Sequence, residues 1–118
     1  HHTVQGGSNI IKLRGRSSFQ SPAYNAVKMI EAAMGGEKFT LPAGCYVKCD
    51  KCGFKNVMMA MPTTIDKTGV HFTEPTGTEE ELASLAKSYE HLCKMRDEIV
   101  ELGIVPPVAE WKEMNPNL

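Results

Sequence analysis

The chain has 118 residues, of which 42% are hydrophobic and 23% are charged, and its formal net charge is -1. This length and composition are typical of one soluble globular domain. The near-zero net charge argues against nucleic acid or an anionic membrane surface as the main partner. No apolar run approaches the roughly 20 residues that cross a bilayer, and no secretory signal opens the chain, so we expect a cytoplasmic protein.

The chain begins with two histidines, which resemble an affinity tag more than a natural start. Residues 1–6 are therefore interpreted as a tag or an artificial start, and His1 and His2 are left out of the site reasoning. Residues 7–118 are expected to form a single domain.

A broken helix is predicted over residues 8–34. Its second piece carries apolar residues at steps of three and four, which is typical of an amphipathic helix: Ala23, Ala26, Val27, Ile30, Ala33 and Met34. Ser21 is expected to cap this piece, with Pro22 at its first helical position, where the missing N–H costs no hydrogen bond. Gly35 and Gly36 should end it.

The joint near residues 15–20 of this broken helix is polar and contains Ser17 and Ser18. Each serine hydroxyl can donate and accept a hydrogen bond, so a small polar ligand could bind there. The alternative is that both serines only cap the kink. The residues alone leave both interpretations open.

Short strands are predicted to follow. They cover residues 45–49, residues 56–61, residues 63–65 as a continuation of the second strand, and residues 70–73 after a hairpin turn at 66–69. The nearly continuous apolar run at 56–61 indicates burial on both faces, so Met58, Met59 and Met61 are interpreted as core residues. Three strands with short links predict an antiparallel meander.

A long amphipathic helix is predicted from Thr78 to about Leu102. Thr78 and Glu81 have the spacing of a capping box, and Gly103 should stop the helix. Trp111 is expected to anchor the tail that follows. The fold predicted from these elements is α+β, an antiparallel β-meander packed with two or three long helices.

Cys49 and Cys52, followed by Gly53, have the spacing of half a zinc ribbon, because such a turn aims two thiolates at one metal. Cys45 could supply a third sulfur from the preceding strand, but the sequence has no second C-x-x-C pair. A redox-active pair is disfavoured because no helix N-terminus follows to lower a thiol pKa. The simpler interpretation is reduced thiols on a hairpin, with no metal.

The remaining chemical residues do not complete an active site. His71 and His91 lack a neighbouring nucleophile or carboxylate in a catalytic spacing, so we expect both at or near the surface. Lys12, Arg14 and Arg16 form a small basic cluster, which is a weak signal for nucleic acid in a chain of this charge.

Several stretches resemble the lactate/malate dehydrogenase family. Residues 7–23 resemble the broken helix that opens the last third of that family, and matching stretches follow at 41–47, 56–66 and 78–102. Residues 109–118 are similar to the ending of bacterial malate dehydrogenases. The resemblance covers residues 7–118, so the chain is identified as the C-terminal, substrate-binding domain of such an enzyme.

This resemblance implies NAD-dependent interconversion of malate and oxaloacetate by the full-length enzyme. The NAD-binding Rossmann domain and the catalytic residues of the family lie upstream of this part, so no catalytic or cofactor-binding residue is assigned in this chain. We therefore expect the chain to be inactive alone, and no metal is expected. Where the family closes a small or hydroxyl-bearing residue over the bound oxo- or hydroxy-acid, this sequence has Ser17 and Ser18.

The resemblance also implies a homo-oligomer, with the Ser8–Met34 region in the contact between subunits. A different class of function stays open from the residues alone. In that alternative the chain is a small zinc-binding interaction module built on the hairpin of residues 45–53, with Cys49 and Cys52 as metal ligands.

Overall fold

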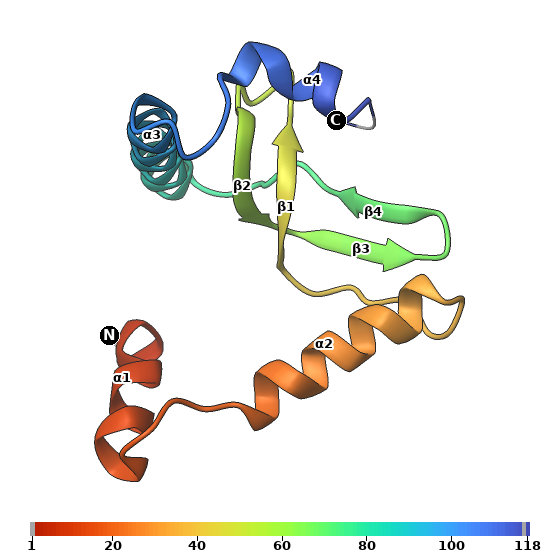
Figure 1. The fold of residues 1–118 in the computed structure, drawn as a ribbon. Coiled ribbons are helices and arrows are strands. Elements are labelled where there is room, and N and C mark those ends of the chain that lie inside the picture. The colour runs from red at the N-terminus through yellow and green to blue at the C-terminus, as the bar shows by residue number, and fades with distance from the viewer. Residues whose placement is uncertain (1, 117) are drawn as a thin grey trace. The chain divides into compact units, whose positions relative to one another are not determined.

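The computed structural model of the protein describes residues 2–116 and 118. Its elements in chain order are α1 (His2–Arg14), α2 (Gln20–Ala33), β1 (Ala43–Lys48), β2 (Lys55–Met61), β3 (Thr63–Asp66), β4 (Gly69–Phe72), α3 (Glu79–Glu101), the 3-10 helix η1 (Val108–Glu110) and α4 (Trp111–Met114) (Figure 1). Helices together with antiparallel strands confirm the predicted α+β class. Among the described residues, no helix has both the length and the apolar character needed to span a membrane.

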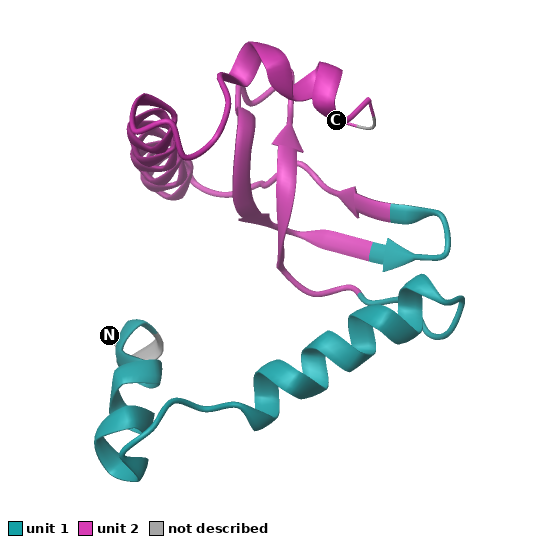
Figure 2. Cartoon of the chain, viewed as in Figure 1, with its two compact units in different colours: residues 1–39, 65–69 teal, residues 40–64, 70–118 magenta. Residues whose placement is uncertain are grey.

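The chain divides into two compact units (Figure 2). The N-terminal unit comprises residues 1–39 and 65–69, and the C-terminal unit comprises residues 40–64 and 70–118. The joint with the two serines therefore belongs to the N-terminal unit, and the cysteine hairpin belongs to the C-terminal unit.

The predicted broken helix is present in the N-terminal unit, but its ends differ. α1 ends at Arg14, and Gly15 follows with a positive φ of 70° and donates its N–H back to the helix. α2 begins at Gln20, so the prediction that Ser21 caps it and that Pro22 is its first residue is wrong. Pro22 still lies in the first turn, where its missing N–H costs no intrahelical hydrogen bond.

The other end of α2 lies at the predicted pair of glycines. The N–H of Gly35 donates to the Ala32 carbonyl at 3.1 Å, and the N–H of Gly36 donates to the Glu31 carbonyl at 2.9 Å. Gly35 has a φ of 93°, a left-handed conformation that glycine adopts without steric cost. These contacts satisfy carbonyl groups that the end of a helix otherwise leaves without a partner.

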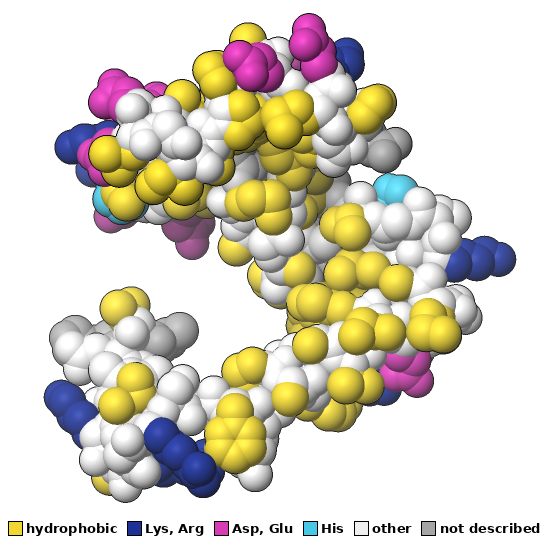
Figure 3. All heavy atoms as spheres, in the orientation of Figure 1, with side chains coloured by type: hydrophobic (Ala, Val, Ile, Leu, Met, Phe, Trp, Pro, Cys, Tyr) yellow, Lys and Arg dark blue, Asp and Glu magenta, His cyan; other side chains and the backbone are white. Residues whose placement is uncertain are grey.

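An apolar stripe runs along α2 and includes Met34, the residue that follows the helix. Tyr24, Val27, Ile30 and Met34 are each more than half exposed, whereas Ala32 is buried. Figure 3 shows hydrophobic side chains along this helix on the face in view. Val27, Ile30 and Met34 belong to the stripe predicted from the sequence periodicity, and the described chain leaves them exposed. Exposed apolar stripes of this kind commonly mark interaction surfaces.

β1 and β2 form an antiparallel pair whose inward face is the core of the C-terminal unit. Cys45 lies opposite Met59, and Val47 lies opposite Val57. Burial alternates along both strands, as expected when successive side chains point to opposite faces. The buried core positions of the pair are Ala43, Cys45, Val47, Val57, Met59 and Met61.

The predicted burial of residues 56–61 on both faces is wrong. Met58 is 62% exposed, whereas Met61 is 1% exposed. Because neighbouring side chains of a strand point in opposite directions, Met58 points away from the core that Met59 and Met61 enter. An unbroken apolar run therefore does not require a strand that is covered on both sides.

α3 packs on this core through residues that include Tyr89 and Leu92. The rings of Phe54 and Tyr89 stack with their centres 4.6 Å apart. The predicted capping box is confirmed: the Thr78 hydroxyl accepts the N–H of Glu81, and the Glu81 carboxylate accepts the N–H of Thr78. The long helix predicted from the sequence therefore begins where expected.

The C-terminal tail also follows the prediction. α3 ends at Glu101, and Gly103 follows with a φ of 68°. Trp111 anchors the tail, since its Nε1–H donates to the Pro106 carbonyl at 2.7 Å and its ring centre lies 6.5 Å from that of Tyr46.

The prediction that the strands form one three-stranded meander is wrong. β1 pairs with β2 and β3 pairs with β4, so the strands form two separate two-stranded sheets. Pro62 lies between β2 and β3, and a proline has no N–H to donate to a ladder. Beside this break the Thr63 hydroxyl donates to the Met61 carbonyl at 2.7 Å. The predicted hairpin turn at 66–69 joins β3 to β4.

Asp66 holds that turn. Its carboxylate accepts hydrogen bonds from the hydroxyl and the N–H of Thr68 and lies 3.4 Å from the Lys38 ammonium. The Thr68 hydroxyl and N–H, followed by Lys38, lower the pKa of Asp66 from 3.8 to about 2. Because folding lowers this pKa, the resulting stabilisation is fully present above pH 3.8 and is lost as the pH falls toward about 2.

Asp66→Asn is therefore expected to lower Tm at neutral pH and to leave Tm unchanged below a pH of about 2, where the native carboxyl is protonated. Thermal melts of both proteins over this pH range measure the effect. Lys67→Gln in the same turn is the control, because a lysine does not change its charge in acid. A Tm difference between native protein and Asp66→Asn that is independent of pH would contradict the prediction.

Candidate functional site

Ser17 and Ser18 lie in the non-helical joint between α1 and α2, as the sequence predicts. Ser17 is exposed and Ser18 is half-buried. The Ser17 hydroxyl donates to the Ser18 carbonyl at 3.4 Å. Phe19 occupies the N-cap position of α2, and no side-chain cap hydrogen bond is present there. The two hydroxyls therefore keep most of their hydrogen-bonding capacity for a ligand.

The joint is also electropositive. The guanidinium carbons of Arg14 and Arg16 lie 5.8 Å and 5.1 Å from the centre of the Phe19 ring, within the range of a cation–π contact. α2 has no acidic residue in its first turn and no side-chain cap, so its first backbone N–H groups are available to an anion. A carboxylate group suits this combination of donors and positive charge.

The contribution of Arg14 and Arg16 was not evident from the sequence, where with Lys12 they formed only a weak signal for nucleic acid. One signal in the sequence could have found it. Arg16 and Phe19 flank the two serines, so a cation, two hydroxyls and an aromatic ring occur at four successive positions.

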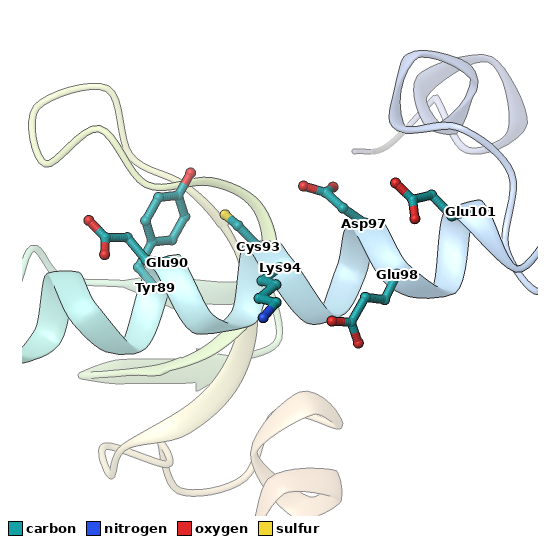
Figure 4. Close-up of a pocket in the computed structure, with 7 residues that line it drawn as sticks. All are labelled: Tyr89, Glu90, Cys93, Lys94, Asp97, Glu98 and Glu101. Carbon is teal, nitrogen blue, oxygen red and sulfur yellow. The ribbon is translucent and has the colours of Figure 1, made fainter.

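An open hollow of about 570 Å³ lies along α3 and is a poor site for a dicarboxylate. It is lined by Tyr89, Glu90, Cys93, Lys94, Asp97, Glu98 and Glu101 (Figure 4). In Figure 4 Asp97 and Glu101 point to one side of the helix and Glu98 points to the other. Carboxylates outnumber the single lysine of this lining, so the hollow repels anions. It contains neither of the serines predicted for the site.

The turn at Cys49 and Cys52 holds a second polar cluster. The two cysteines form a disulfide with their Cα atoms 5.7 Å apart, so the prediction of reduced thiols on this hairpin is wrong for this structure. Glu74 joins them, since one ligand atom from each of the three residues lies within 4.8 Å of the other two. Glu74 Oε1 lies 3.5 Å from Cys49 Sγ.

Cys45 does not belong to this cluster, so the third sulfur considered from the sequence is wrong. Its thiol is buried in the core, while Cys93 is half-buried on α3, and both are free. Glu74 was missed because it lies 25 positions from Cys49 in the sequence. The histidines outside the N-terminal pair are exposed, as predicted: His71 and His91.

A family comparison identifies the domain. The family model of the lactate/malate dehydrogenase alpha/beta C-terminal domain matches residues 1–102. The chain belongs to this family. The match confirms the resemblance found in the sequence. Residues 2–6 lie in α1, and their interpretation as part of a tag or an artificial start stays a prediction.

The dehydrogenase domain is similar to malate dehydrogenases of several organisms. That of Geobacillus kaustophilus is 36% identical over 90 residues, which cover 75% of this chain and 28% of that protein. The malate dehydrogenase of Anoxybacillus flavithermus is 34% identical over 90 residues, with coverage of 75% and 28%. That of Sorangium cellulosum is 34% identical over 87 residues, with coverage of 73% and 28%.

The chain thus spans about 28% of the length of these curated relatives. The family match and the relatives together favour a dehydrogenase domain over a small zinc-binding interaction module.

Proposed function

We propose that this dehydrogenase domain is part of an NAD-dependent malate dehydrogenase and that the joint between α1 and α2 contacts malate or oxaloacetate. The joint itself is the observation that supports this best. It combines two serine hydroxyls, two guanidinium groups and an uncapped helix N-terminus in one short segment. Both substrates carry two carboxylates, which such groups attract. The names of the relatives fit the same substrate pair.

In this proposal the hydroxyls of Ser17 and Ser18 donate hydrogen bonds to a carboxylate or to the C2 oxygen of the substrate. Arg16 adds positive charge beside them, and its contact with Phe19 limits the motion of its side chain. Hydrogen bonds to charged groups are stronger than those between neutral groups. These residues contribute binding and orientation of the substrate, which lower the entropic part of the barrier.

We assign the NAD site to a part of the enzyme outside this chain. A dinucleotide site needs a glycine-rich loop between a strand and a helix. In the described residues Gly6 and Gly7 lie within α1, and Gly35 and Gly36 follow α2, so neither pair fits the cofactor. This chain therefore contributes to substrate binding rather than to hydride transfer.

The same proposal includes a homo-oligomer and keeps the cytoplasmic location expected from the sequence. The apolar stripe of α2, which contains Tyr24, Val27, Ile30 and Met34, supports self-association because apolar area gains free energy when a second chain covers it. It lies within the Ser8–Met34 region that the resemblance assigns to the subunit contact.

The proposed function is tested by activity. The full-length enzyme that contains this chain is expected to oxidise NADH when oxaloacetate is supplied, and the absorbance of NADH follows the reaction. The 118-residue chain alone is expected to show no turnover, because it provides no dinucleotide site. Turnover by the chain alone, or a full-length enzyme that reduces other 2-oxo acids but not oxaloacetate, would contradict the proposal.

A further inference from the structure

We propose that Cys49, Cys52 and Glu74 in the C-terminal unit bind one zinc ion when the two cysteines are reduced. This site uses none of the residues of the joint and does not depend on the proposed dehydrogenase function. Zinc suits the donor set, because it binds thiolate sulfur and carboxylate oxygen in a tetrahedral arrangement.

The contact between Cys49 and Glu74 has the length expected between two ligands of a tetrahedral metal. With Zn–S bonds of about 2.3 Å and Zn–O bonds of about 2.0–2.2 Å, sulfur and oxygen at two corners of the tetrahedron are about 3.5–3.7 Å apart. Cys49 Sγ and Glu74 Oε1 are 3.5 Å apart. Cysteines whose Cα atoms are 5.7 Å apart can form a disulfide, and once reduced they can place both sulfurs on one metal.

The backbone turn around Cys49 is shaped to hold a thiolate. The N–H of Cys52 donates to Cys49 Sγ at 3.3 Å, and the N–H of Cys49 donates to the Phe54 carbonyl at 2.9 Å. Gly53 has a φ of 73°, which lets the chain fold back behind the two sulfurs. A hydrogen bond to sulfur stabilises its ionised form, and the ionised form is the metal ligand.

The position of Glu74 beside the cysteines suits a site that holds a cation. A disulfide sulfur carries no proton, so Glu74 meets no donor at Cys49 in the oxidised state. In the reduced state two thiolates and one carboxylate repel one another unless a cation lies among them. A divalent ion offsets two of these three charges, and the Lys51 ammonium, 3.6 Å from Glu74 Oε2, offsets the third.

Water completes the tetrahedron from the solvent side. An open pocket of about 360 Å³ lies beside Cys52 and Glu74 and is bordered by apolar side chains such as Phe54 and Leu82. Cys49 is only 7% exposed, so its sulfur is shielded while the pocket admits a water-sized ligand. Zinc sites with three protein ligands commonly keep a water molecule in the fourth position.

Zinc binding requires the reduced pair. A water-soluble phosphine converts the disulfide to two thiols and leaves as the phosphine oxide, with its oxygen taken from one water molecule. Each thiol then loses its proton as its sulfur bonds to zinc. Binding therefore releases two protons per zinc ion and strengthens as the pH rises.

The test measures zinc in the 118-residue chain after reduction with the phosphine. His1 and His2 are first replaced by alanine, because histidines are zinc ligands in their own right. Elemental analysis after dialysis gives the stoichiometry, and competition with a chromogenic chelator gives the affinity. We expect one zinc ion per chain, and we expect Cys49→Ser and Cys52→Ser each to abolish it.

Glu74→Gln is expected to weaken zinc affinity at least tenfold. Even the loss of a residue that only hydrogen-bonds to a metal ligand commonly lowers metal affinity about 10- to 100-fold. The matched controls are Glu79→Gln and Cys93→Ser, whose side chains lie outside the cluster. Both controls should keep one zinc ion per chain with unchanged affinity. Equal affinity of Glu74→Gln and the unsubstituted chain would overturn the site with three protein ligands.

A measurement with the native cysteines covers the case in which the serine variants do not fold. Zinc is expected to protect Cys49 and Cys52, but not Cys93, from alkylation by iodoacetamide, as mapped by mass spectrometry. Cobalt in place of zinc should give a thiolate-to-metal charge-transfer band. A reduced chain that binds no zinc, or alkylation that zinc does not slow, would overturn the proposal and leave the pair as a disulfide only.

Discussion

Replacing both Ser17 and Ser18 by alanine in the full-length enzyme is expected to lower kcat/KM for oxaloacetate about ten- to a hundredfold. The two hydroxyls lie at the joint, where α2 has no side-chain cap and the Ser17 hydroxyl has only a long contact of 3.4 Å. A hydrogen bond to a charged group contributes about 1.5–3 kcal/mol, and its loss from the transition state reduces kcat/KM by the corresponding factor. Steady-state kinetics at saturating NADH measure the effect.

Ser21→Ala is the matched control, because Ser21 is an exposed serine inside the first turn of α2. It should leave kcat/KM unchanged, and the double variant should keep the Kd of NADH. The competing account makes Ser17 and Ser18 structural caps. The double variant would support that account if its kcat/KM is unchanged and its free energy of unfolding falls by about 1 kcal/mol per serine. This result would contradict the proposed substrate contact.

Met61→Ala in the 118-residue chain is expected to lower the free energy of unfolding of the C-terminal unit by about 2–5 kcal/mol. Met61 is 1% exposed and belongs to the same core cluster as Val47, which is 0% exposed. Alanine removes most of the side chain, and a close-packed core relaxes only partly into the cavity that remains. Denaturant unfolding followed by circular dichroism measures the change.

Met58→Ala is the matched control on the same strand. Met58 is 62% exposed and lies outside the core cluster, so its replacement should change the free energy of unfolding by no more than about 0.5 kcal/mol. Similar losses for the two variants would contradict the alternation of buried and exposed residues along β2. They would instead support the burial on both faces that the apolar run predicts.

The sequence by itself determined most of the helix ends. Thr78 and Glu81 are three residues apart, so their reciprocal hydrogen bonds form within one turn. Gly35 and Gly103 take positive φ values just beyond the ends of α2 and α3. These features depend on contacts within a few residues, which is why sequence patterns find them. The start of α2 is the exception, because the cap predicted at Ser21 does not form.

The position of the candidate site in the chain was predictable from the sequence, but the side-chain contacts within it were not. A polar joint between two helical pieces follows from the periodicity of the sequence, and the structure has that joint. The contact of Arg16 with the Phe19 ring was not predictable, because it depends on the path of the backbone through the joint. That path sets which side chains share the space beside Ser17 and Ser18.

Only the tertiary structure decided which side of β2 is buried and which residue meets the cysteine turn. Met58 and Met61 belong to one apolar run, yet Met58 is 62% exposed and Met61 is 1% exposed. The difference arises because only Met61 enters the core. Glu74 reaches Cys49 across 25 positions of sequence. Such contacts depend on how the whole unit packs, and local periodicity carries no information about partners that far apart in the chain.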